Sequence, residues 1–223
     1  MKVVIFDTET TGLPKMSLSK TPQIEDSLKY PHIVQFSYVV FDTSNNTIIK
    51  IYDKVIGIPA DIEISKESIA LHHITREIID AQGIQIEEAL LEFLTDFAEA
   101  DMVVGHNIQF DNNMVIMELR RNIHIFEEEL IAHYQTSDKF YCTMKNSIEL
   151  CAIKVCYKNS TKTYNKFPKL VELYAFLFRQ TPTKLHNSLN DVIICLRCFC
   201  KIYLSIDITE TSPDIAQMCN DIM

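Results

Sequence analysis

The sequence predicts an α/β fold in which helices are layered on a sheet. A short apolar run at residues 2–6 ends at Asp7, as expected of a buried strand. Residues 33–41 and 48–56 are predicted as two more strands, joined by the turn-prone residues 42–46. Three strands in series imply an antiparallel meander. An amphipathic helix is predicted over residues 86–99, with apolar side chains at the helical spacing: Ile86, Ala89, Leu90, Phe93, Leu94 and Phe97.

The remaining elements alternate between helical and strand-like segments. Residues 65–81 are predicted to be helical, with a break near residues 73–75. Strands are expected at 102–105 and 139–143, and helices at 110–121, at 168–179 and from Asn187 or Ser188 to about 204. The helix at 168–179 is ended by the sequence Thr181-Pro182-Thr183. The best candidate for a loop or insertion is residues 154–167.

Length and composition are those of an ordinary globular domain. The chain has 223 residues, of which 47% are hydrophobic and 23% charged, and it contains no apolar run long enough to span a membrane. The apolar start is too short for a signal peptide, so we expect an intracellular protein (cytoplasmic, nuclear or viral) that is not secreted. We expect one domain over residues 1–204, followed by a polar, acidic tail at 205–223 with a helical turn beginning at Pro213.

The charge is unevenly distributed along the chain. The net charge is −9, yet residues 154–184 carry +6, which leaves −15 for the rest. A basic stretch beside acidic motifs would suit a polyanionic partner such as a nucleic acid. The alternative, which charge alone favours, is a solvated lysine-rich loop.

The first motif is Phe-Asp-Thr-Glu-Thr-Thr-Gly-Leu, at the end of the first strand. Residues two apart in a strand share a face, so Asp7 and Glu9 are expected to emerge together while Thr8 points away. Gly12 would permit a tight turn against a ligand. Two acids two apart are common on solvated strands, but here they end a buried, apolar one.

The second motif is Gly-His-Asn-Ile-Gln-Phe-Asp, which follows the strand at 102–105. Asp111 opens a helix, where an acid is stabilising on its own account, so a capping role is a serious alternative. Asn107 is expected to hold the connection by side-chain hydrogen bonds. Phe110 is expected to pack against a base.

The third motif is His-Asn-Ser-Leu-Asn-Asp, at the start of the last long helix. Asp191 lies within the first turns of that helix, on a rigid backbone, whereas His186 precedes it in a loop. A carboxylate on a rigid element and a base on a mobile one suit metal binding and proton transfer. A lone histidine before a helix is more often a surface residue.

A fold that gathers Asp7, Glu9, Asp111 and Asp191 would place four carboxylates in one pocket. Such a pocket repels itself unless divalent cations fill it. Hard cations with oxygen ligands indicate Mg²⁺ or Mn²⁺, and hence phosphate chemistry.

Taken together, the three motifs resemble those of the DEDDh 3′–5′ exonuclease superfamily, which includes proofreading subunits of polymerases and three-prime repair exonucleases. The resemblance covers most of the chain, from Lys2 to about Leu204, and extends to the segments Leu71-His72-His73-Ile74-Thr75 and Lys169-Leu170-x-x-Leu173-Tyr174. It implies a ribonuclease H-like fold, with a mixed central sheet flanked by helices, and therefore an exonuclease domain over residues 1–204.

The resemblance also implies residue roles. Asp7, Glu9, Asp111 and Asp191 would bind two Mg²⁺ or Mn²⁺ ions, and His186 would be the general base. The 3′-terminal nucleotide would contact a further set of residues, in which Leu13 acts as an apolar wedge: Thr8, Thr10, Thr11, Gly12, Leu13, His72, Asn107 and Phe110. Two positions depart from the family pattern. His73 stands where the family often has glycine, and Ser188 where it often has alanine.

The implied reaction is hydrolysis of the last phosphodiester of a strand, with release of a nucleoside 5′-monophosphate. DNA is favoured over RNA as the substrate, and a polymerase or other replication protein is a candidate partner; no membrane association is expected. One alternative is a catalytically weak nucleic-acid-binding or polymerase-associated subunit of the same fold. Two others are a ribonuclease H-like endonuclease or integrase and an unrelated metal-stabilised domain.

Overall fold

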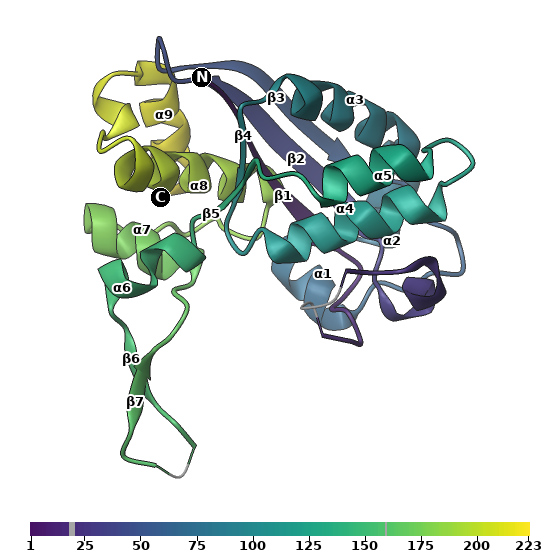
Figure 1. Ribbon diagram of the computed structural model, residues 1–223, viewed down its shortest axis with the longest axis horizontal. Helices are drawn as coiled ribbons and strands as arrows, with labels where there is room; N and C mark the ends of the chain where they lie inside the picture. Colours follow the sequence, from purple (N-terminus) through teal and green to yellow (C-terminus); the bar gives the residue numbers. More distant parts are fainter. Residues whose placement is uncertain (18–20, 159) are drawn as a thin grey trace.

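A five-stranded mixed sheet lies at the centre of the computed structural model, which describes residues 1–17, 21–158 and 160–223 (Figure 1). The strand order is β3-β2-β1-β4-β5. The bounds are β1 Lys2–Thr10, β2 Ile33–Asp42, β3 Thr47–Val55, β4 Met102–Gly105 and β5 Phe140–Cys142. β1, β2 and β3 pair antiparallel, whereas β4 pairs parallel with both β1 and β5. The predicted meander and the mixed ribonuclease H-like sheet are both confirmed.

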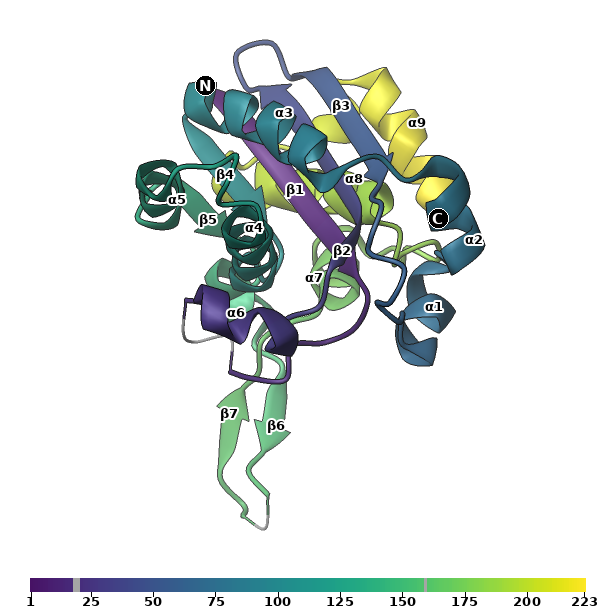
Figure 2. The ribbon, with the colours of Figure 1, turned by 90° about the vertical axis from the view of Figure 1, so that its right-hand side faces the viewer.

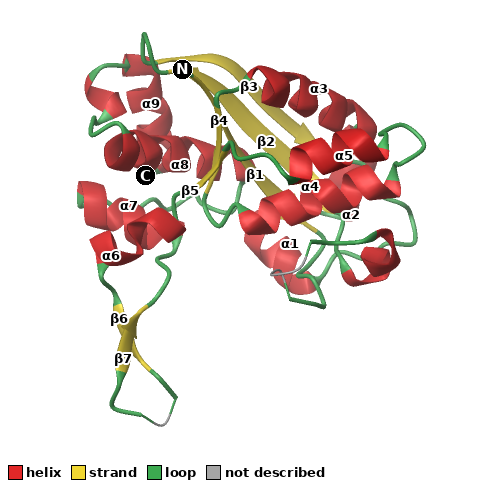
Figure 3. Ribbon diagram, in the orientation of Figure 1, coloured by secondary structure: helices red, strands yellow, loops and turns green. Residues whose placement is uncertain are grey.

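Helices cover both faces of the sheet (Figure 3). One face is covered by α3 (Ile86–Glu99), α4 (Gln109–Arg121) and α5 (Glu128–Gln135). The other is covered by α7 (Leu170–Phe178), α8 (Ser188–Tyr203) and α9 (Pro213–Ile222). The shorter elements are α1 Lys66–His72, α2 Arg76–Gln82, α6 Ile148–Cys151, β6 Lys154–Cys156, β7 Thr163–Asn165 and the 3₁₀ helices η1 Ile24–Lys29, η2 Lys145–Ser147 and η3 Ile208–Glu210.

β1 is buried on both faces, which explains why its sequence is continuously apolar. Val3 and Ile5 pack toward α8, whereas Val4 and Phe6 pack toward α3 and α4. Because successive side chains of a strand alternate between faces, the alternation continues past the apolar run. The carboxylates that follow therefore lie on the α8 face, and the threonine between them lies on the α4 face.

The core on the α3 face is built around aromatic rings. Phe93 of α3 lies 5.1 Å from Phe6, 5.0 Å from Phe36 and 5.6 Å from Tyr38, measured between ring centroids. The predicted apolar face of α3 is confirmed, with Ile86 half-buried at its start and the other five residues buried. This packing fixes β1 and β2, and so fixes the end of β1 where the first motif lies.

The predicted break in the 65–81 helix is also confirmed. α1 ends at His72, and His73 adopts the left-handed conformation, with a φ of 61°. Its N–H donates to the carbonyl of Ile69, which closes the helix. α2 then begins after Thr75.

The C-terminal segment differs from the expected polar tail. Residues 205–223 contain η3 and α9, and α9 packs on α8. Ile208, Ile215, Cys219 and Ile222 are buried in the core on the α8 face. The last three recur at helical spacing, so a short segment that is polar on average still presents one apolar stripe. The segment is an integral layer of the fold.

The predicted loop at 154–167 is largely a β-hairpin. β6 and β7 pair antiparallel, and the hairpin extends away from the helices and the main sheet (Figure 2). Among the described residues, no helix is both long and apolar enough to cross a membrane.

Candidate active site

Four carboxylates meet where β1, α4 and α8 converge. Asp7 and Glu9 project from the end of β1 on the α8 face, and Asp191 lies in the first turn of α8. Asp111 reaches the same place from the first turn of α4. Burial, together with the charges of Asp111, Asp191 and Glu9, raises the pKa of Asp7 well above its usual value. The three predicted motifs therefore form one site.

The other three carboxylates are perturbed in the same direction. Burial and the charges of Asp191 and Asp111 raise the pKa of Glu9 to about 8. Burial raises the pKa of Asp111 and that of Asp191 to about 7 each. Buried carboxylates close to one another take up protons more readily, because burial disfavours the charged form and the negative charges repel each other. The donor set, all carboxylate oxygens, fits a hard divalent cation such as Mg²⁺ or Mn²⁺.

His186 lies beside this cluster. One ligand atom each from Glu9, His186 and Asp191 lie within 4.8 Å of one another. His186 is exposed and has a φ of 66°, and its backbone N–H donates to Oδ2 of Asp191 at 3.1 Å. The left-handed turn thus ties the loop to α8 and directs the imidazole toward Glu9 and Asp191. His186 therefore lies close to two of the four acids.

Thr8 supports the cluster from the opposite face of the sheet. Its backbone N–H and its hydroxyl both donate to Oδ1 of Asp111, at 3.0 Å and 2.7 Å. Thr8 does point away from Asp7 and Glu9, as the strand alternation predicts. Its hydroxyl is nevertheless engaged with a site carboxylate.

Ser188 supports Asp7 in a similar way. This fully buried residue donates from its hydroxyl to the backbone carbonyl of Asp7 at 2.6 Å, and from its N–H to Oε1 of Gln35 at 3.2 Å. Gln35 in turn donates to Oδ1 of Asp53 at 2.8 Å. These bonds join the start of α8 to β1, β2 and β3. Sequence reasoning missed Gln35, although a glutamine within the apolar run 33–41 was a signal.

The turn after β1 is held mainly by the protein itself. The Thr10 hydroxyl donates to the Gly12 carbonyl at 2.7 Å, and the Thr11 hydroxyl accepts from the N–H of His32 at 3.0 Å. The carbonyl of Thr11 accepts from the N–H of Ser65 at 2.8 Å, which joins the turn to the N-cap of α1. Both threonines are buried. They line the adjoining pocket, but their hydroxyl groups form hydrogen bonds within the protein that hold the turn after β1.

His72 holds the same turn through a hydrogen bond to its backbone. The N–H of Ile74 donates to Nδ1 of His72 at 3.0 Å, so Nδ1 is an acceptor and Nε2 carries the proton. Nε2 lies 3.3 Å from the carbonyl of Thr10, to which it donates. Burial lowers the pKa of His72, in keeping with a neutral ring. His72 therefore positions the turn as an uncharged hydrogen-bond donor.

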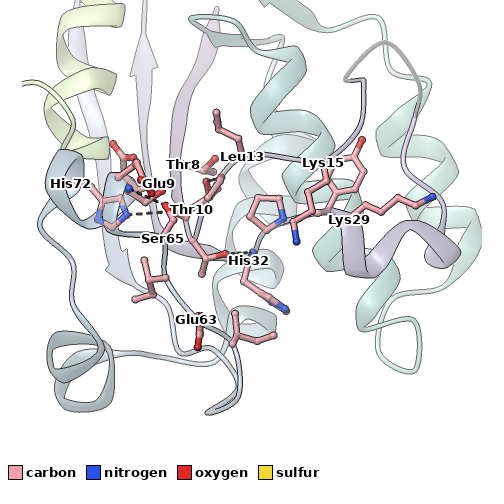
Figure 4. A pocket seen from close by; sticks show the side chains of 18 of the residues that line it. Thr8, Glu9, Thr10, Leu13, Lys15, Lys29, His32, Glu63, Ser65 and His72 are labelled. Carbon is pink, nitrogen blue, oxygen red and sulfur yellow. Dashed lines mark hydrogen bonds between the residues drawn. The ribbon is translucent and has the colours of Figure 1, made fainter.

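A pocket of about 890 Å³ opens beside Glu9 (Figure 4). Leu13, which is 80% exposed, stands in it, and Phe110 lines it as well. Lys15 and Lys29 lie on the side opposite His72. The pocket wall thus combines apolar surface with charged side chains of both signs: two lysines, of which Lys29 pairs with Asp26 at 2.9 Å, and the acids Glu9, Asp61, Glu63 and Glu67.

Gly12 also lines this pocket, for a reason that differs from the predicted one. The described glycines all have φ outside the left-handed region, so the turn does not require Gly12 for its conformation. A Cβ at this position would meet no protein atom closer than Ser65 Oγ at 3.9 Å. The missing side chain leaves open space at the pocket wall.

Asn107 shapes the second motif through its backbone. It has a φ of 65°, and its carbonyl accepts from the N–H of Phe110 at 2.8 Å. Within the described residues its side chain forms no hydrogen bond, contrary to the expected role, because the backbone bond already closes this turn. The turn directs the chain from β4 into α4 and so places Asp111.

The comparisons with known proteins agree with this geometry. The model of the RNase_T exonuclease family matches residues 4–199. The chain belongs to this exonuclease family. No curated protein sequence matches it significantly. Its motifs are of the DEDDh type.

Solved structures share the fold of this exonuclease-family chain. Escherichia coli Exonuclease I in complex with a dA16 oligonucleotide matches with a TM-score of 0.62 and 13% identity over 92% of this chain and 41% of that one. A zinc-bound complex of the same enzyme with single-stranded DNA matches at 0.63 and 14%, over 97% and 42%. Exonuclease I from Methylocaldum szegediense matches at 0.60 and 16%, over 94% and 42%. The chain spans about two fifths of the length of these proteins.

One histidine of this exonuclease-family chain was missed as a positioning residue. His106 is enclosed between Oγ1 of Thr143 and the carbonyl of Pro168, each 3.0 Å from a ring nitrogen. Since a carbonyl only accepts, Nε2 carries the proton and donates to Pro168. Burial lowers the pKa of His106 to about 4, so the ring is neutral at ordinary pH. It ties the second motif to the segment before α7.

Proposed function

We propose that this chain is a metal-dependent 3′–5′ exonuclease. It hydrolyses phosphodiester bonds from the 3′ end of a nucleic acid, with DNA favoured over RNA, and releases nucleoside 5′-monophosphates. The observation that carries the proposal is the convergence of Asp7, Glu9, Asp111 and Asp191 with His186 beside them. Membership of the exonuclease family supports it.

Asp7, Glu9, Asp111 and Asp191 would hold two divalent ions, Mg²⁺ or Mn²⁺. When bound, such ions stabilise the negative charge on the attacking and leaving oxygens of a phosphoryl displacement. His186 acts as the general base and accepts a proton from the attacking water at an imidazole nitrogen. Its position beside Glu9 and Asp191 places that nitrogen next to the carboxylates. The 3′-hydroxyl of the shortened strand leaves.

Selection for a strand end would come from the pocket beside Glu9. Leu13 and Phe110 offer apolar surface against which the terminal base can pack, and the turn from Thr10 to Gly12 forms a wall held by His72 and Ser65. Asn107 supports this pocket by placing Phe110. A polymerase or replication partner remains part of the proposal, on the strength of the resemblance to proofreading subunits.

The test is digestion of a 5′-labelled single-stranded DNA, in parallel with a matched RNA. The expected product is a ladder that shortens from the 3′ end and is abolished by EDTA. Asp7→Ala and Asp191→Ala should abolish digestion with the fold intact, whereas Asp80→Ala, which removes an exposed aspartate on α2, should not. Binding without digestion by the wild type would instead support the catalytically weak binding subunit.

His186 is tested separately. His186→Ala should lose on the order of 10²–10⁴ in rate while still binding the oligonucleotide. His124→Ala, which removes an exposed histidine elsewhere, is the control. Near-normal turnover of His186→Ala would remove this residue from the mechanism.

A further inference from the structure

The β6–β7 hairpin projects from the domain and contributes nothing to its buried core (Figure 2). β6 and β7 pair Lys154 with Asn165 and Cys156 with Thr163. The next pair is formed by Tyr157, whose N–H donates to the carbonyl of Lys162 at 3.0 Å. None of the hairpin's described residues from 154 to 166 is buried. Packing therefore does not account for its side chains.

The hairpin is strongly basic in an acidic protein. Residues 154–166 contain four lysines and no aspartate or glutamate, although the chain as a whole has a net charge of −9. Lys166 forms an ion pair with Glu172 at 2.5 Å, so part of its charge is neutralised. Lys154, Lys158 and Lys162 are exposed and form no ion pair within the described residues. Their charge is available to an anionic partner.

One face of the hairpin combines aromatic rings with a lysine. Because Tyr157 pairs with Lys162 and Val155 with Tyr164, these four side chains share a face of the two-stranded sheet. The rings of Tyr157 and Tyr164 lie 4.6 Å apart and are 54% and 43% exposed. Exposed rings beside cations are the surface on which single-stranded nucleic acids stack.

The base of the hairpin is fastened beside the active site. The N–H of Lys166 donates to the carbonyl of Ile153 at 2.9 Å, which closes the stem. Two residues later, the carbonyl of Pro168 accepts from His106, which belongs to the same motif as Asp111. The strand β6 alone rises about 10 Å from this base. The arm therefore starts from a segment that is bonded to the second motif, and it extends outward from there.

We infer that the hairpin is a docking arm for single-stranded DNA, which holds the part of the strand upstream of the 3′ end. This inference rests on the proposed exonuclease function. Tyr157 and Tyr164 stack with bases, and Lys154, Lys158 and Lys162 contact phosphates. Such contacts tolerate any sequence, as an enzyme that digests along a strand requires. The arm raises affinity for long strands and takes no part in the chemistry.

The experiment measures binding of a 5′-fluorescein 20-nucleotide single-stranded DNA in EDTA over a range of salt concentrations, and digestion of the same DNA and of a trinucleotide in Mg²⁺. Lys158→Ala/Lys162→Ala should weaken binding of the 20-mer and reduce the slope of log affinity against log salt by about 1.4. The matched control, Lys54→Ala/Lys201→Ala, removes two exposed lysines elsewhere and should leave that slope unchanged.

The tyrosines have a different signature. Tyr157→Ala/Tyr164→Ala should weaken binding roughly tenfold without changing the salt slope, since no charge is removed. Tyr157→Phe/Tyr164→Phe keeps both rings and should restore the affinity. The lysine-to-alanine and the tyrosine-to-alanine double variants should each raise KM for the 20-mer. Neither should change kcat or the digestion of the trinucleotide. A thermal melt checks that the domain is folded.

The outcomes separate the two proposals. Suppose that the wild type digests the DNA and that both alanine double variants keep its 20-mer affinity and its salt slope. This result would overturn the proposal of a docking arm but not the proposed exonuclease function. The basic arm would then fit an acidic protein partner instead. A wild type that neither binds nor digests the DNA would overturn both. Loss of trinucleotide digestion in a hairpin variant would also contradict an arm that is separate from the chemistry.

Discussion

Thr8 holds Asp111 with two hydrogen bonds, one from its backbone N–H at 3.0 Å and one from its hydroxyl at 2.7 Å. The pair joins β1 to α4, so the first and second motifs are linked directly. Both bonds favour the ionised form of Asp111 and oppose the effect of burial, which raises its pKa to about 7. The threonine between the two acids of the first motif thus holds the carboxylate of the second motif in place and favours its ionised form.

Thr8→Val tests this role because it removes the hydroxyl and nearly keeps the shape. Partners that hydrogen-bond a metal ligand typically contribute 10–100-fold to metal affinity or activity. We expect a loss of that order in Mn²⁺ affinity, measured by titration, and in digestion rate. Thr8→Ser keeps the hydroxyl and should retain most of both. If the valine variant binds Mn²⁺ and digests DNA like the wild type, the hydroxyl does not position Asp111.

The carboxylate cluster predicts an unusual dependence of stability on pH. Free carboxyl groups titrate near pH 4, whereas those of Glu9, Asp111 and Asp191 titrate at about 7–8 in the folded chain without metal. Between these values the folded state binds more protons than the unfolded state, so stability falls as pH rises. In EDTA, Tm should drop by roughly 5–10 °C from pH 5.5 to 8. Millimolar Mn²⁺ should reduce that drop, and an equal drop with and without Mn²⁺ would argue against a clustered metal site.

Replacing Asp7 with asparagine tests how much the repulsion among the four carboxylates destabilises the folded chain. Asp7→Asn removes one charge from the cluster, and burial with three neighbouring acids already raises the pKa of Asp7. We expect the variant to have a higher Tm than the wild type in EDTA at pH 8 and to lose the stabilisation by Mn²⁺. Asp80→Asn, on the exposed surface of α2, is the control. A lower Tm for Asp7→Asn would mean that the ionised carboxylate is held by hydrogen bonds.

His73 offers a test of backbone strain outside the site. It is left-handed, with a φ of 61°, at the position where the superfamily often has glycine. A side chain in this region costs about 1–2 kcal/mol, which the greater freedom of an unfolded glycine partly offsets. His73→Gly should therefore raise the free energy of unfolding in urea by about 1 kcal/mol or less. A clear decrease would show that the imidazole makes a stabilising contact.

The parts of the fold that could be predicted are those that carry a strong periodic signal. β1, β2 and α3 follow from their patterns because each buries most of a strand or a helix face in the core. β3 follows from its alternation of exposed and half-buried residues. α9 was predicted only as a helical turn in a polar tail, because a ten-residue segment with three buried residues, Ile215, Cys219 and Ile222, gives a weak periodic signal. The hairpin was missed because it buries nothing, so no alternation of polar and apolar residues marks its strands.

In the candidate site, too, some residues could be predicted from the sequence and others could not. The four acids and His186 could be recognised because the three motifs that carry them resemble those of the DEDDh superfamily in residue type, order and spacing. Their supports could not, because Gln35, Ser188 and His106 act through hydrogen bonds to backbone atoms that are distant in sequence. Only the folded chain brings these partners together. For Gln35, a polar residue within the apolar run 33–41 was a hint, but it did not indicate which partner the side chain binds.

Gly12 provides the sharpest test of where the substrate lies. A Cβ added there meets no protein atom closer than 3.9 Å, and the backbone is not left-handed, so Gly12→Ala should fold with unchanged or slightly higher Tm. The new methyl group would occupy the wall of the pocket beside Glu9, so we expect kcat/KM on single-stranded DNA to fall about tenfold.

Gly83→Ala is the matched contrast for this substitution. Its Cβ would lie 2.6 Å from the carbonyl oxygen of Ile79 and 2.8 Å from the nitrogen of Gly57, so the variant should lose Tm through a clash with backbone. Any activity lost by Gly83→Ala should follow its loss of folded protein, whereas Gly12→Ala should lose activity at full stability. Full activity in Gly12→Ala would place the terminal nucleotide away from this turn, because a methyl group that touches no protein atom can obstruct only a bound ligand.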